Sequence, residues 1–198
     1  MGSVGAIILA AGGSSRFGRA KQLLWFRGES LVRRAVRHAN QATCRPVVVV
    51  TGEAHDKIKS ELDGTPAIVV KNPEWHLGLG TSLRCGLRSI LSSQSDLENV
   101  ILLLCDQPFA DATIIQALIQ EQLNSGKSIV ASAYAGTVGV PALFNRGRFK
   151  DLLALPNDCG AKSVIESQPA DVARVIFEKG VVDIDTVEDF ERLGTVAE

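Results

Sequence analysis

The sequence predicts a three-layer α/β/α sandwich, in which helices cover both faces of a mostly parallel β-sheet. Short apolar runs alternate with amphipathic stretches along the whole chain of 198 residues. The apolar runs are continuous, which is typical of strands that are buried on both faces of a sheet. The chain contains no internal repeat, low-complexity tract or linker, so residues 1–198 are expected to form a single domain.

The predicted strands are short and rich in β-branched residues. The run GAIILAA forms the first, PVVVVTG the second, and NVILLLCD lies near the middle of the chain. PAIVVKN and SIVASAY complete the set, because each has the length of a strand and is bounded by polar or turn-forming residues. The predicted strands span residues 5–11, 46–52, 66–72, 99–106 and 128–134.

Amphipathic segments between these strands predict helices. Residues 30–42 place apolar side chains at helical spacing on one face and Arg33, Arg34, Arg37 and His38 on the other. Residues 54–63 predict a second helix, and a third starts near Thr81 or Ser82, either of which would cap it. A fourth helix follows the strand at 99–106, with its apolar residues at Ile114, Ile115, Leu118, Ile119 and Leu123.

Composition excludes several classes of function. The net charge is −1 and aromatic residues make up 5% of the chain, so we expect neither a nucleic-acid partner nor a base-stacking platform for one. No apolar run reaches the length of a membrane span, and we expect no membrane partner. The four cysteines are scattered and form no C-x-x-C pair, which favours a reduced, cytoplasmic protein without a zinc knuckle.

Ligands of parallel α/β sheets bind beyond the carboxyl ends of the strands, so the loop after the first strand is a candidate binding site. Gly12, Gly13 and Gly18 allow its backbone to approach a ligand closely, and Arg16 and Lys21 supply positive charge. The loop matches neither the G-x-G-x-x-G fingerprint nor a Walker A motif. A strand-to-helix turn with surface charges would explain the glycines alone, but the combination with two cations favours phosphate binding.

The stretch LAAGGSSRFGRAKQLL resembles the signature of the MobA-like nucleotidyltransferases, and most closely that of the molybdenum cofactor cytidylyltransferase branch. The resemblance extends along nearly the whole chain. It includes GLGTSLRCGL at 78–87, LLLCDQP at 102–108, GVPALF at 139–144, NDCGAK at 157–162 and DIDTVEDF at 183–190. Related guanylyltransferases typically read L-A-G-G where this chain has L-A-A-G, which favours CTP over GTP.

The resemblance implies a Rossmann-like fold of the nucleotide-diphospho-sugar transferase type. It also implies transfer of CMP from CTP to the phosphate of molybdopterin or the molybdenum cofactor, with release of pyrophosphate and with Mg²⁺ as the metal. A molybdenum hydroxylase or its maturation factor is the implied recipient of the product. Such a reaction needs cations and backbone donors around the phosphates more than it needs an enzyme nucleophile.

The same resemblance assigns the site residues. Arg16 would hold the β- and γ-phosphates, Lys21 would lie near the α-phosphate, and these two with Asp106 would be the catalytic residues. Asp106 and Asp185 would bind the metal, with Asp183 as the fallback ligand. The expected nucleotide-binding residues are Leu9, Ala10, Ala11, Gly12, Gly13, Ser15, Arg16, Lys21, Gly80, Thr81 and Ser82, and the expected acceptor-binding residues are Pro141, Gly160 and Lys162.

Structural alternatives stay open for several of these residues. Asp106 would equally serve as a turn cap before Pro108, and Lys162 as a solvated surface residue. Thr186 and Asp189 form an expected capping box, which leaves Asp185 without a structural role. The histidines His38, His55 and His76 are isolated in the sequence and receive no chemical role.

Three alternative functions also stay open. The first is a cytidylyltransferase for another small acceptor, such as a sugar phosphate or polyol phosphate. The second is a non-catalytic partner that holds molybdopterin or nucleotide for a molybdenum hydroxylase. The third is a redox enzyme on the same scaffold, which the absence of a nicotinamide fingerprint disfavours.

Overall fold

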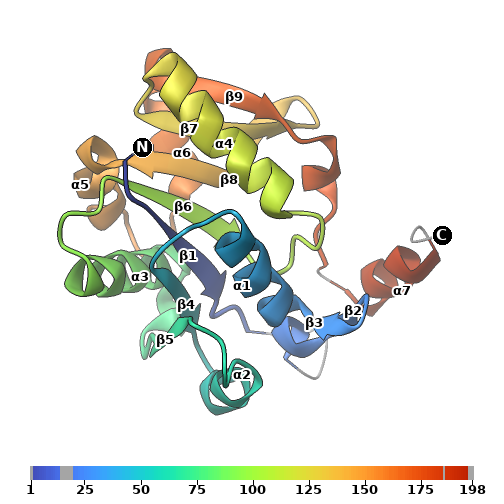
Figure 1. Ribbon diagram of the computed structural model, residues 1–198. Coiled ribbons are helices and arrows are strands. Elements are labelled where there is room, and N and C mark those ends of the chain that lie inside the picture. Colours follow the sequence, from blue (N-terminus) through green and yellow to red (C-terminus); the bar gives the residue numbers. More distant parts are fainter. Residues whose placement is uncertain (1, 14–19, 185, 196–198) are drawn as a thin grey trace.

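A seven-stranded sheet runs through the centre of the computed structural model, which describes residues 2–13, 20–184 and 186–195 (Figure 1). The strand order is β5-β4-β1-β6-β8-β7-β9, and every neighbouring pair is parallel except the two pairs that involve β8. The predicted mostly parallel sheet is therefore confirmed. The strands are β1 (Val4–Ala10), β4 (Val47–Thr51), β5 (Ile68–Lys71), β6 (Asn99–Leu104), β7 (Ile129–Tyr134), β8 (Thr137–Asn145) and β9 (Val172–Ile176).

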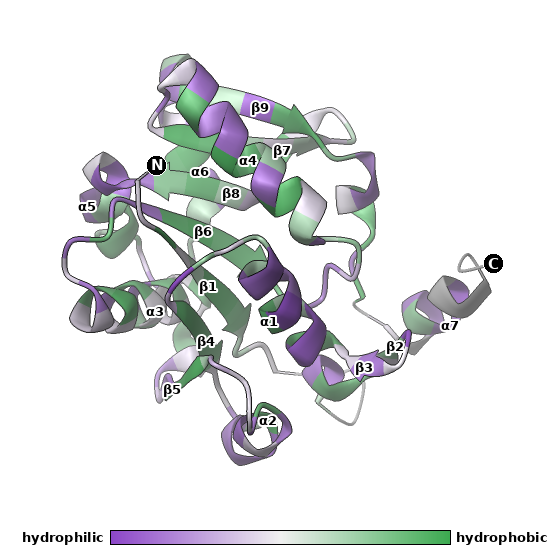
Figure 2. Cartoon of the chain, in the orientation of Figure 1, coloured by the Kyte–Doolittle hydropathy of each residue, from purple (hydrophilic) through white to green (hydrophobic). Residues whose placement is uncertain are grey.

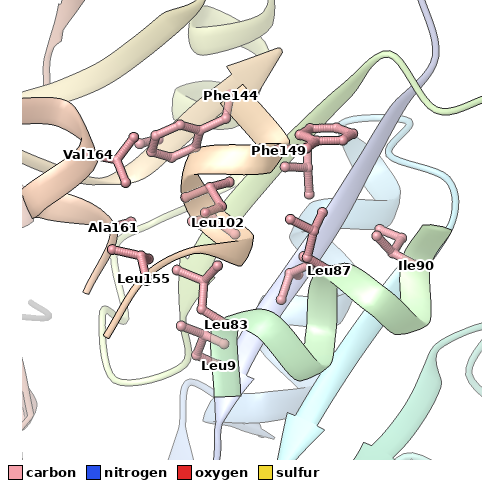
Figure 3. Packing of buried hydrophobic residues seen from close by; sticks show 14 of the residues in the cluster. Leu9, Leu83, Leu87, Ile90, Leu102, Phe144, Phe149, Leu155, Ala161 and Val164 are labelled. Carbon is pink, nitrogen blue, oxygen red and sulfur yellow. The ribbon is translucent and has the colours of Figure 1, made fainter. Parts of the chain in front are cut away.

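Helices cover both faces of this sheet, and two apolar clusters fill the spaces between the layers. One cluster joins the sheet to α3 (Leu79–Ser93), α5 (Phe149–Leu153) and α6 (Ala161–Ser167), as Figure 3 shows from close by. The other joins the opposite face to α1 (Leu31–Gln41), α2 (His55–Glu61) and α4 (Ala112–Ser125). Figure 2 shows the resulting pattern, with a hydrophobic sheet and hydrophilic outer faces on α1 and α4.

Local signals define the ends of the longer helices. The Ser30 hydroxyl accepts a hydrogen bond from the backbone N–H of Arg33, so the predicted helix at 30–42 begins one residue after its cap. Asp111 caps α4 by accepting from the N–H groups of Thr113 and Ile114, and Gly126 ends that helix in the left-handed conformation.

Strand β8 was not predicted, because the motif GVPALF contains a proline that is unusual inside a sheet. The pairing explains how Pro141 fits. Its neighbour Ala142 pairs with both flanking strands, whereas the register of β7 shifts between Ala131 and Ser132, opposite Pro141. Pro141 therefore lies in an irregular part of the ladder, where its missing N–H costs no regular strand hydrogen bond.

A small second unit lies at the carboxyl edge of the sheet. The hairpin of β2 (Trp25–Phe26) and β3 (Glu29–Ser30) packs beside α7 (Val187–Thr195), as Figure 1 shows. Their apolar cluster contains Leu24, Phe26, Leu31 and Ile184, which are all buried. Residues 24–31 and a segment near the end of the described chain thus meet at the edge where ligands of parallel sheets bind. No helix in this described part of the chain has both the length and the apolar character that crossing a bilayer requires.

Candidate active site

The loops that follow β1 and β6 open side by side, because these strands are parallel neighbours with Leu9 opposite Leu104. Ala11, Gly12 and Gly13 follow the first strand, and Cys105 and Asp106 follow the second. The side chain of Gln22 donates a 2.8 Å hydrogen bond to the carbonyl oxygen of Gly12, which joins this loop to the segment carrying Lys21. The two motifs singled out in the sequence are therefore adjacent in space.

Lys21 and Asp106 form an ion pair at this edge. The distance from Lys21 Nζ to Asp106 Oδ2 is 2.7 Å, and the exposed fractions of the side chains are 14% and 19%. Lys21 Nζ also donates to the carbonyl oxygen of Ile184 at 3.3 Å. Ile184 in turn donates its backbone N–H to the carbonyl oxygen of Asp106 at 3.0 Å. Three segments far apart in sequence thus fix the lysine and the carboxylate together.

A cavity of about 280 Å³ opens beside this ion pair. It is lined by Lys21, Asp106 and five further residues that the sequence assigned to the nucleotide, namely Leu9, Ala11, Gly12, Gly13 and Ser82. Ala10 instead packs in the core on the opposite face, because successive strand residues point to opposite sides of a sheet. The prediction for Ala10 is therefore not supported by the position of its side chain.

Gly80 and Thr81 do not line the cavity. The Thr81 hydroxyl accepts from Asn72 Nδ2 at 2.9 Å and lies 2.7 Å from the carbonyl oxygen of Gly78. Gly80 donates its N–H to Asn157, and a side chain at Gly80 would collide with the backbone of that turn. The predicted cap at Thr81 or Ser82 is wrong, because the helix begins at Leu79 and both residues are buried inside it.

The three predicted acceptor residues also lie outside this cavity. Pro141 is buried in β8, where its carbonyl oxygen accepts a 2.6 Å hydrogen bond from the Ser132 hydroxyl. Gly160 precedes α6. The Lys162 side chain is 55% exposed and forms an ion pair with Glu166 at 3.7 Å, in agreement with the surface alternative.

Arg16, Ser15 and Asp185 lie outside the described residues, so their predicted roles stay predictions. The backbone next to Asp185 is placed, since buried Ile184 is bonded to both Lys21 and Asp106. The capping box is confirmed, because Thr186 and Asp189 exchange hydrogen bonds between side chain and backbone. Asp183, the fallback ligand, is exposed.

One carboxylate oxygen of the site fits a metal. Asp106 Oδ1 is buried and has no hydrogen-bond partner among the described residues, whereas its other oxygen binds Lys21. An anionic oxygen with free lone pairs is the type of ligand that Mg²⁺ prefers. Among the described residues, no three His, Cys, Asp or Glu side chains cluster closely enough to hold a metal, so the triphosphate would have to supply part of the coordination.

Cys105 lines the same cavity and is the only thiol that does so. Burial raises the pKa of this thiol, and the adjacent Asp106 carboxylate raises it further. A thiol held in its neutral form is a poor nucleophile. All four cysteines are free. The cavity therefore lacks an activated cysteine, which agrees with direct transfer between phosphates.

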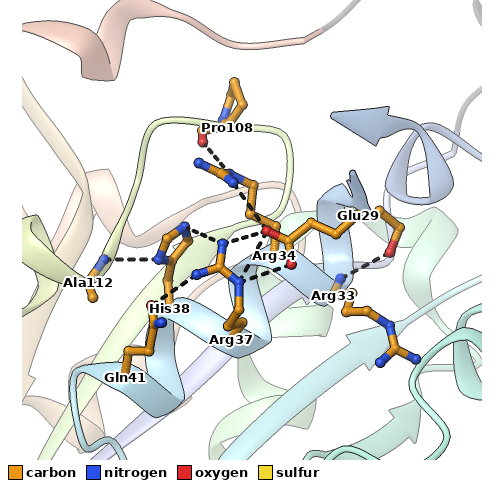
Figure 4. Close-up of polar contacts among 9 residues, drawn as sticks. Glu29, Arg33, Arg34, Arg37, His38, Gln41, Pro108 and Ala112 are labelled. Carbon is orange, nitrogen blue, oxygen red and sulfur yellow. Dashed lines mark hydrogen bonds and ion pairs between the residues drawn. The ribbon is translucent and has the colours of Figure 1, made fainter. Parts of the chain in front are cut away.

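The loop after Asp106 has a second support, shown in Figure 4, that the sequence analysis did not predict. Arg34 Nε donates to the carbonyl oxygen of Pro108 at 2.9 Å, and Arg34 Nη1 lies 3.1 Å from Glu29. Arg37 binds the same carboxylate and lowers the pKa of Glu29. Only 12% of the Arg34 side chain is exposed, although helical periodicity placed it on a polar face. The signal for this support that the sequence did contain was a pair of helical arginines, Arg34 and Arg37, close to Glu29.

His38 is likewise buried, whereas the sequence placed it on the polar face of its helix. Its Nδ1 accepts a 3.3 Å hydrogen bond from the N–H of Ala112 at the start of α4 (Figure 4). Burial lowers the pKa of His38, and the positive charge of Arg37 lowers it further. His38 therefore joins α1 to α4 as a neutral ring, away from the cavity.

An ion pair and a cavity at the carboxyl edge of a mostly parallel sheet are typical of nucleotide-binding α/β proteins. The chain belongs to the MobA-like NTP transferase family, whose sequence profile matches residues 6–172. The predicted family, fold type and nucleotidyltransferase class are thereby confirmed.

Relatives of the chain carry different names. Nicotine blue oxidoreductase of Paenarthrobacter nicotinovorans is 28% identical, with 96% of both chains covered. Molybdenum cofactor cytidylyltransferase of Escherichia coli is 24% identical, with 96% of this chain and 95% of that protein covered. Among solved structures, Rv0371c of Mycobacterium tuberculosis superposes with a TM-score of 0.81 at 29% identity, covering 97% of each chain. A complex of Rv0371c with manganese has a TM-score of 0.77 at 27% identity, covering 96% of this chain and 97% of that one.

Proposed function

We propose that the protein transfers CMP from CTP to the phosphate of molybdopterin or of its molybdenum form and releases pyrophosphate. The observation that carries this proposal is the Lys21–Asp106 pair beside a cavity formed by the glycine loop. The choice of CTP and of a molybdopterin acceptor is supported by the L-A-A-G opening and by similarity to a molybdenum cofactor cytidylyltransferase.

The residues of the cavity would act mainly by holding charge. Lys21 would turn from Asp106 toward the α-phosphate, where its ammonium would offset the charge of the attacking phosphate and of the leaving pyrophosphate. Arg16 would hold the β- and γ-phosphates with its planar fork of donors. The backbone N–H groups of Gly12 and Gly13 would add dipoles that require no reorganisation during the reaction.

A divalent metal fits this arrangement. Mg²⁺, when bound, would neutralise part of the triphosphate charge, and Asp106 with Asp185 would hold it. The unpaired Oδ1 of Asp106 supports this assignment, and the similar protein Rv0371c has been crystallised with manganese. A nucleotide drawing Lys21 away from Asp106 would free the second carboxylate oxygen for the same ion.

The acceptor and the recipient of the product belong to the same proposal. The free cysteines fit a reducing compartment, so we place the reaction in the cytoplasm. A molybdenum hydroxylase, or a factor that matures it, would receive the product. The name of the nicotine blue oxidoreductase relative is consistent with a link to oxidoreductases, but it identifies no partner of this chain.

A pyrophosphate-release assay tests the function directly. CTP, GTP and ATP are each supplied with Mg²⁺ and with molybdopterin, a sugar phosphate or a polyol phosphate as acceptor. We expect release that requires both CTP and molybdopterin. Pyrophosphate release with CTP and a different acceptor would support nucleotidyl transfer but replace molybdopterin as the acceptor. Tight binding of CTP or molybdopterin without pyrophosphate release would indicate a non-catalytic binding partner.

A thermal-shift series tests base choice separately. A nucleotide at 100 times its Kd adds about 2.7 kcal/mol to the free energy of unfolding, so the preferred base gives the largest rise in melting temperature. We expect CTP to exceed GTP at equal concentration with Mg²⁺. A larger shift with GTP would assign the chain to the guanylyltransferases, and the proposed roles of Lys21 and Asp106 would be unchanged.

A further inference from the structure

The cavity has an aromatic side that the sequence did not assign. Trp75 lines it together with His76, whose ring meets the indole edge-on at a centroid distance of 6.2 Å. Trp75 also packs beside Gly52, the residue after β4. Since β4 and β6 flank β1 on opposite sides, Trp75 and Asp106 stand on opposite sides of the glycine loop. The cavity is therefore charged toward β6 and aromatic toward β4.

Two glycines fix the position of the indole. A Cβ at Gly13 would lie 3.0 Å from Cζ3 of Trp75, and a Cβ at Gly52 would lie 2.7 Å from its Cγ. The ring thus lies across the backbone of the glycine loop and the end of β4, where any side chain would displace it. A Cβ at Gly52 would also lie 2.5 Å from the Ala11 carbonyl oxygen, so a side chain there would meet backbone as well as the indole.

The turn that carries Trp75 is tied to the start of α3. Asn72 accepts from the N–H of Glu74 and donates through Nδ2 to the hydroxyls of Thr81 and Ser82. The Thr81 hydroxyl also lies 3.0 Å from the carbonyl oxygen of Glu74. These bonds give Thr81 a structural role, because they hold the residue before Trp75 in place. The indole is consequently preorganised.

We propose that Trp75 stacks against the nucleobase of the bound nucleotide while the Lys21–Asp106 side takes the triphosphate. The inference rests on the proposed function, because it assumes that the cavity binds a nucleoside triphosphate. A flat, fixed aromatic ring offers dispersion contact to the face of a base, and a triphosphate has no such face. Trp75 thus contributes affinity for the nucleoside part of the ligand alone. Its rigid position also limits the space that is left for the base beside it.

The chain contains two tryptophans, which gives a direct optical test. Trp25 is 66% exposed on β2 and does not line the cavity, so Trp25→Phe leaves Trp75 as the sole indole reporter. The fluorescence of this variant is titrated with CTP and with inorganic tripolyphosphate, both with Mg²⁺. We expect CTP to change the Trp75 emission, while tripolyphosphate binds, as thermal shift records, and leaves it unchanged.

Substitution gives the second readout. Trp75→Ala is expected to weaken CTP binding by about 5- to 150-fold, the range that corresponds to 1–3 kcal/mol of base stacking, and to leave tripolyphosphate affinity unchanged. Trp75→Phe keeps a ring and is expected to retain most of the CTP affinity. Trp25→Ala is the matched control and is expected to bind both ligands as the wild type does.

The outcomes separate this inference from the proposed function. Equal weakening of CTP and tripolyphosphate in Trp75→Ala would overturn the stacking role, because the residue would then merely support the glycine loop. Unchanged CTP affinity in a Trp75→Ala variant that folds like the wild type would also overturn the stacking role. In that case, turnover of CTP by the wild type would leave the proposed function intact. A wild-type chain that binds neither ligand would refute the proposed function, and the inference with it.

Discussion

Replacing Asp106 with asparagine tests the centre of the proposed mechanism. The substitution keeps the shape of the side chain but removes the charge that pairs with Lys21 at 2.7 Å. A hydrogen bond to a charged group contributes about 1.5–3 kcal/mol and a neutral one about 0.5–1.5 kcal/mol, so the expected loss of stability is about 1–2 kcal/mol. Lys21 keeps the Ile184 carbonyl oxygen as an acceptor, which limits the loss. For a domain of this size the melting temperature should fall by about 2–8 °C.

The effect on turnover should be far larger than the effect on stability. Removing one electrostatic contact to the transition state typically lowers the rate by about 10²- to 10³-fold. Pyrophosphate release from CTP is measured at saturating Mg²⁺, below the melting temperature of the variant. Asp111→Asn is the matched control, because asparagine caps a helix as well as the aspartate that now binds Thr113 and Ile114. If Asp106→Asn kept the same rate as Asp111→Asn, the carboxylate would have no part in the chemistry.

Three further predictions follow from the same structure. Lys21→Ala and Arg16→Ala should each slow pyrophosphate release by about 10²- to 10³-fold, and near-normal rates in both would make the loop a structural turn. Gly80→Ala should lower the melting temperature, because its new methyl group would meet backbone atoms of the distant turn at residues 156–159, whereas Gly12→Ala, which meets nothing within 4 Å, should not. His38 should make stability depend on pH: its folded pKa lies below the ordinary value of 6.5, so the unfolded chain binds the proton first and stability falls as pH drops below about 6.5. Unfolding curves between pH 5 and 8 should lose part of this slope in His38→Gln, and an unchanged slope would contradict the assignment.

Continuous apolar runs made the parallel part of the sheet predictable. The strands of β1, β4 and β6 are buried on both faces, so their sequences contain the signal directly. Strand β8 escaped prediction because Pro141 is tolerated only through the irregular pairing with β7, which is set by a distant part of the chain. Edge strand β9 reads VARVI, and three of its five residues are only half-buried, so its local pattern is weak.

The site was predictable where chemistry follows from a short motif. The two motifs that carry Lys21 and Asp106 were expected at the carboxyl ends of strands, and the structure brings these two side chains together at that edge. The contact of the Thr81 hydroxyl with Asn72 could not be predicted, because a hydroxyl looks the same in sequence whether it faces a ligand or another side chain. Trp75 was missed because its position in the cavity depends on two glycines, Gly13 and Gly52, that belong to separate loops. Contacts between loops produce no periodic pattern in a sequence.

The contact of Lys21 with Ile184 has a consequence for the stage of synthesis at which the site can form. The two residues are 163 positions apart, yet the carbonyl oxygen of Ile184 binds the amine of Lys21 and its N–H binds Asp106. A ribosome would finish every strand of the central sheet before it releases this segment. The nascent chain could therefore fold its core while the lysine and the carboxylate still lack their third anchor. Competence to bind nucleotide would therefore appear only after residue 184 has been made, and a chain stopped before that residue would have a folded sheet without a finished site.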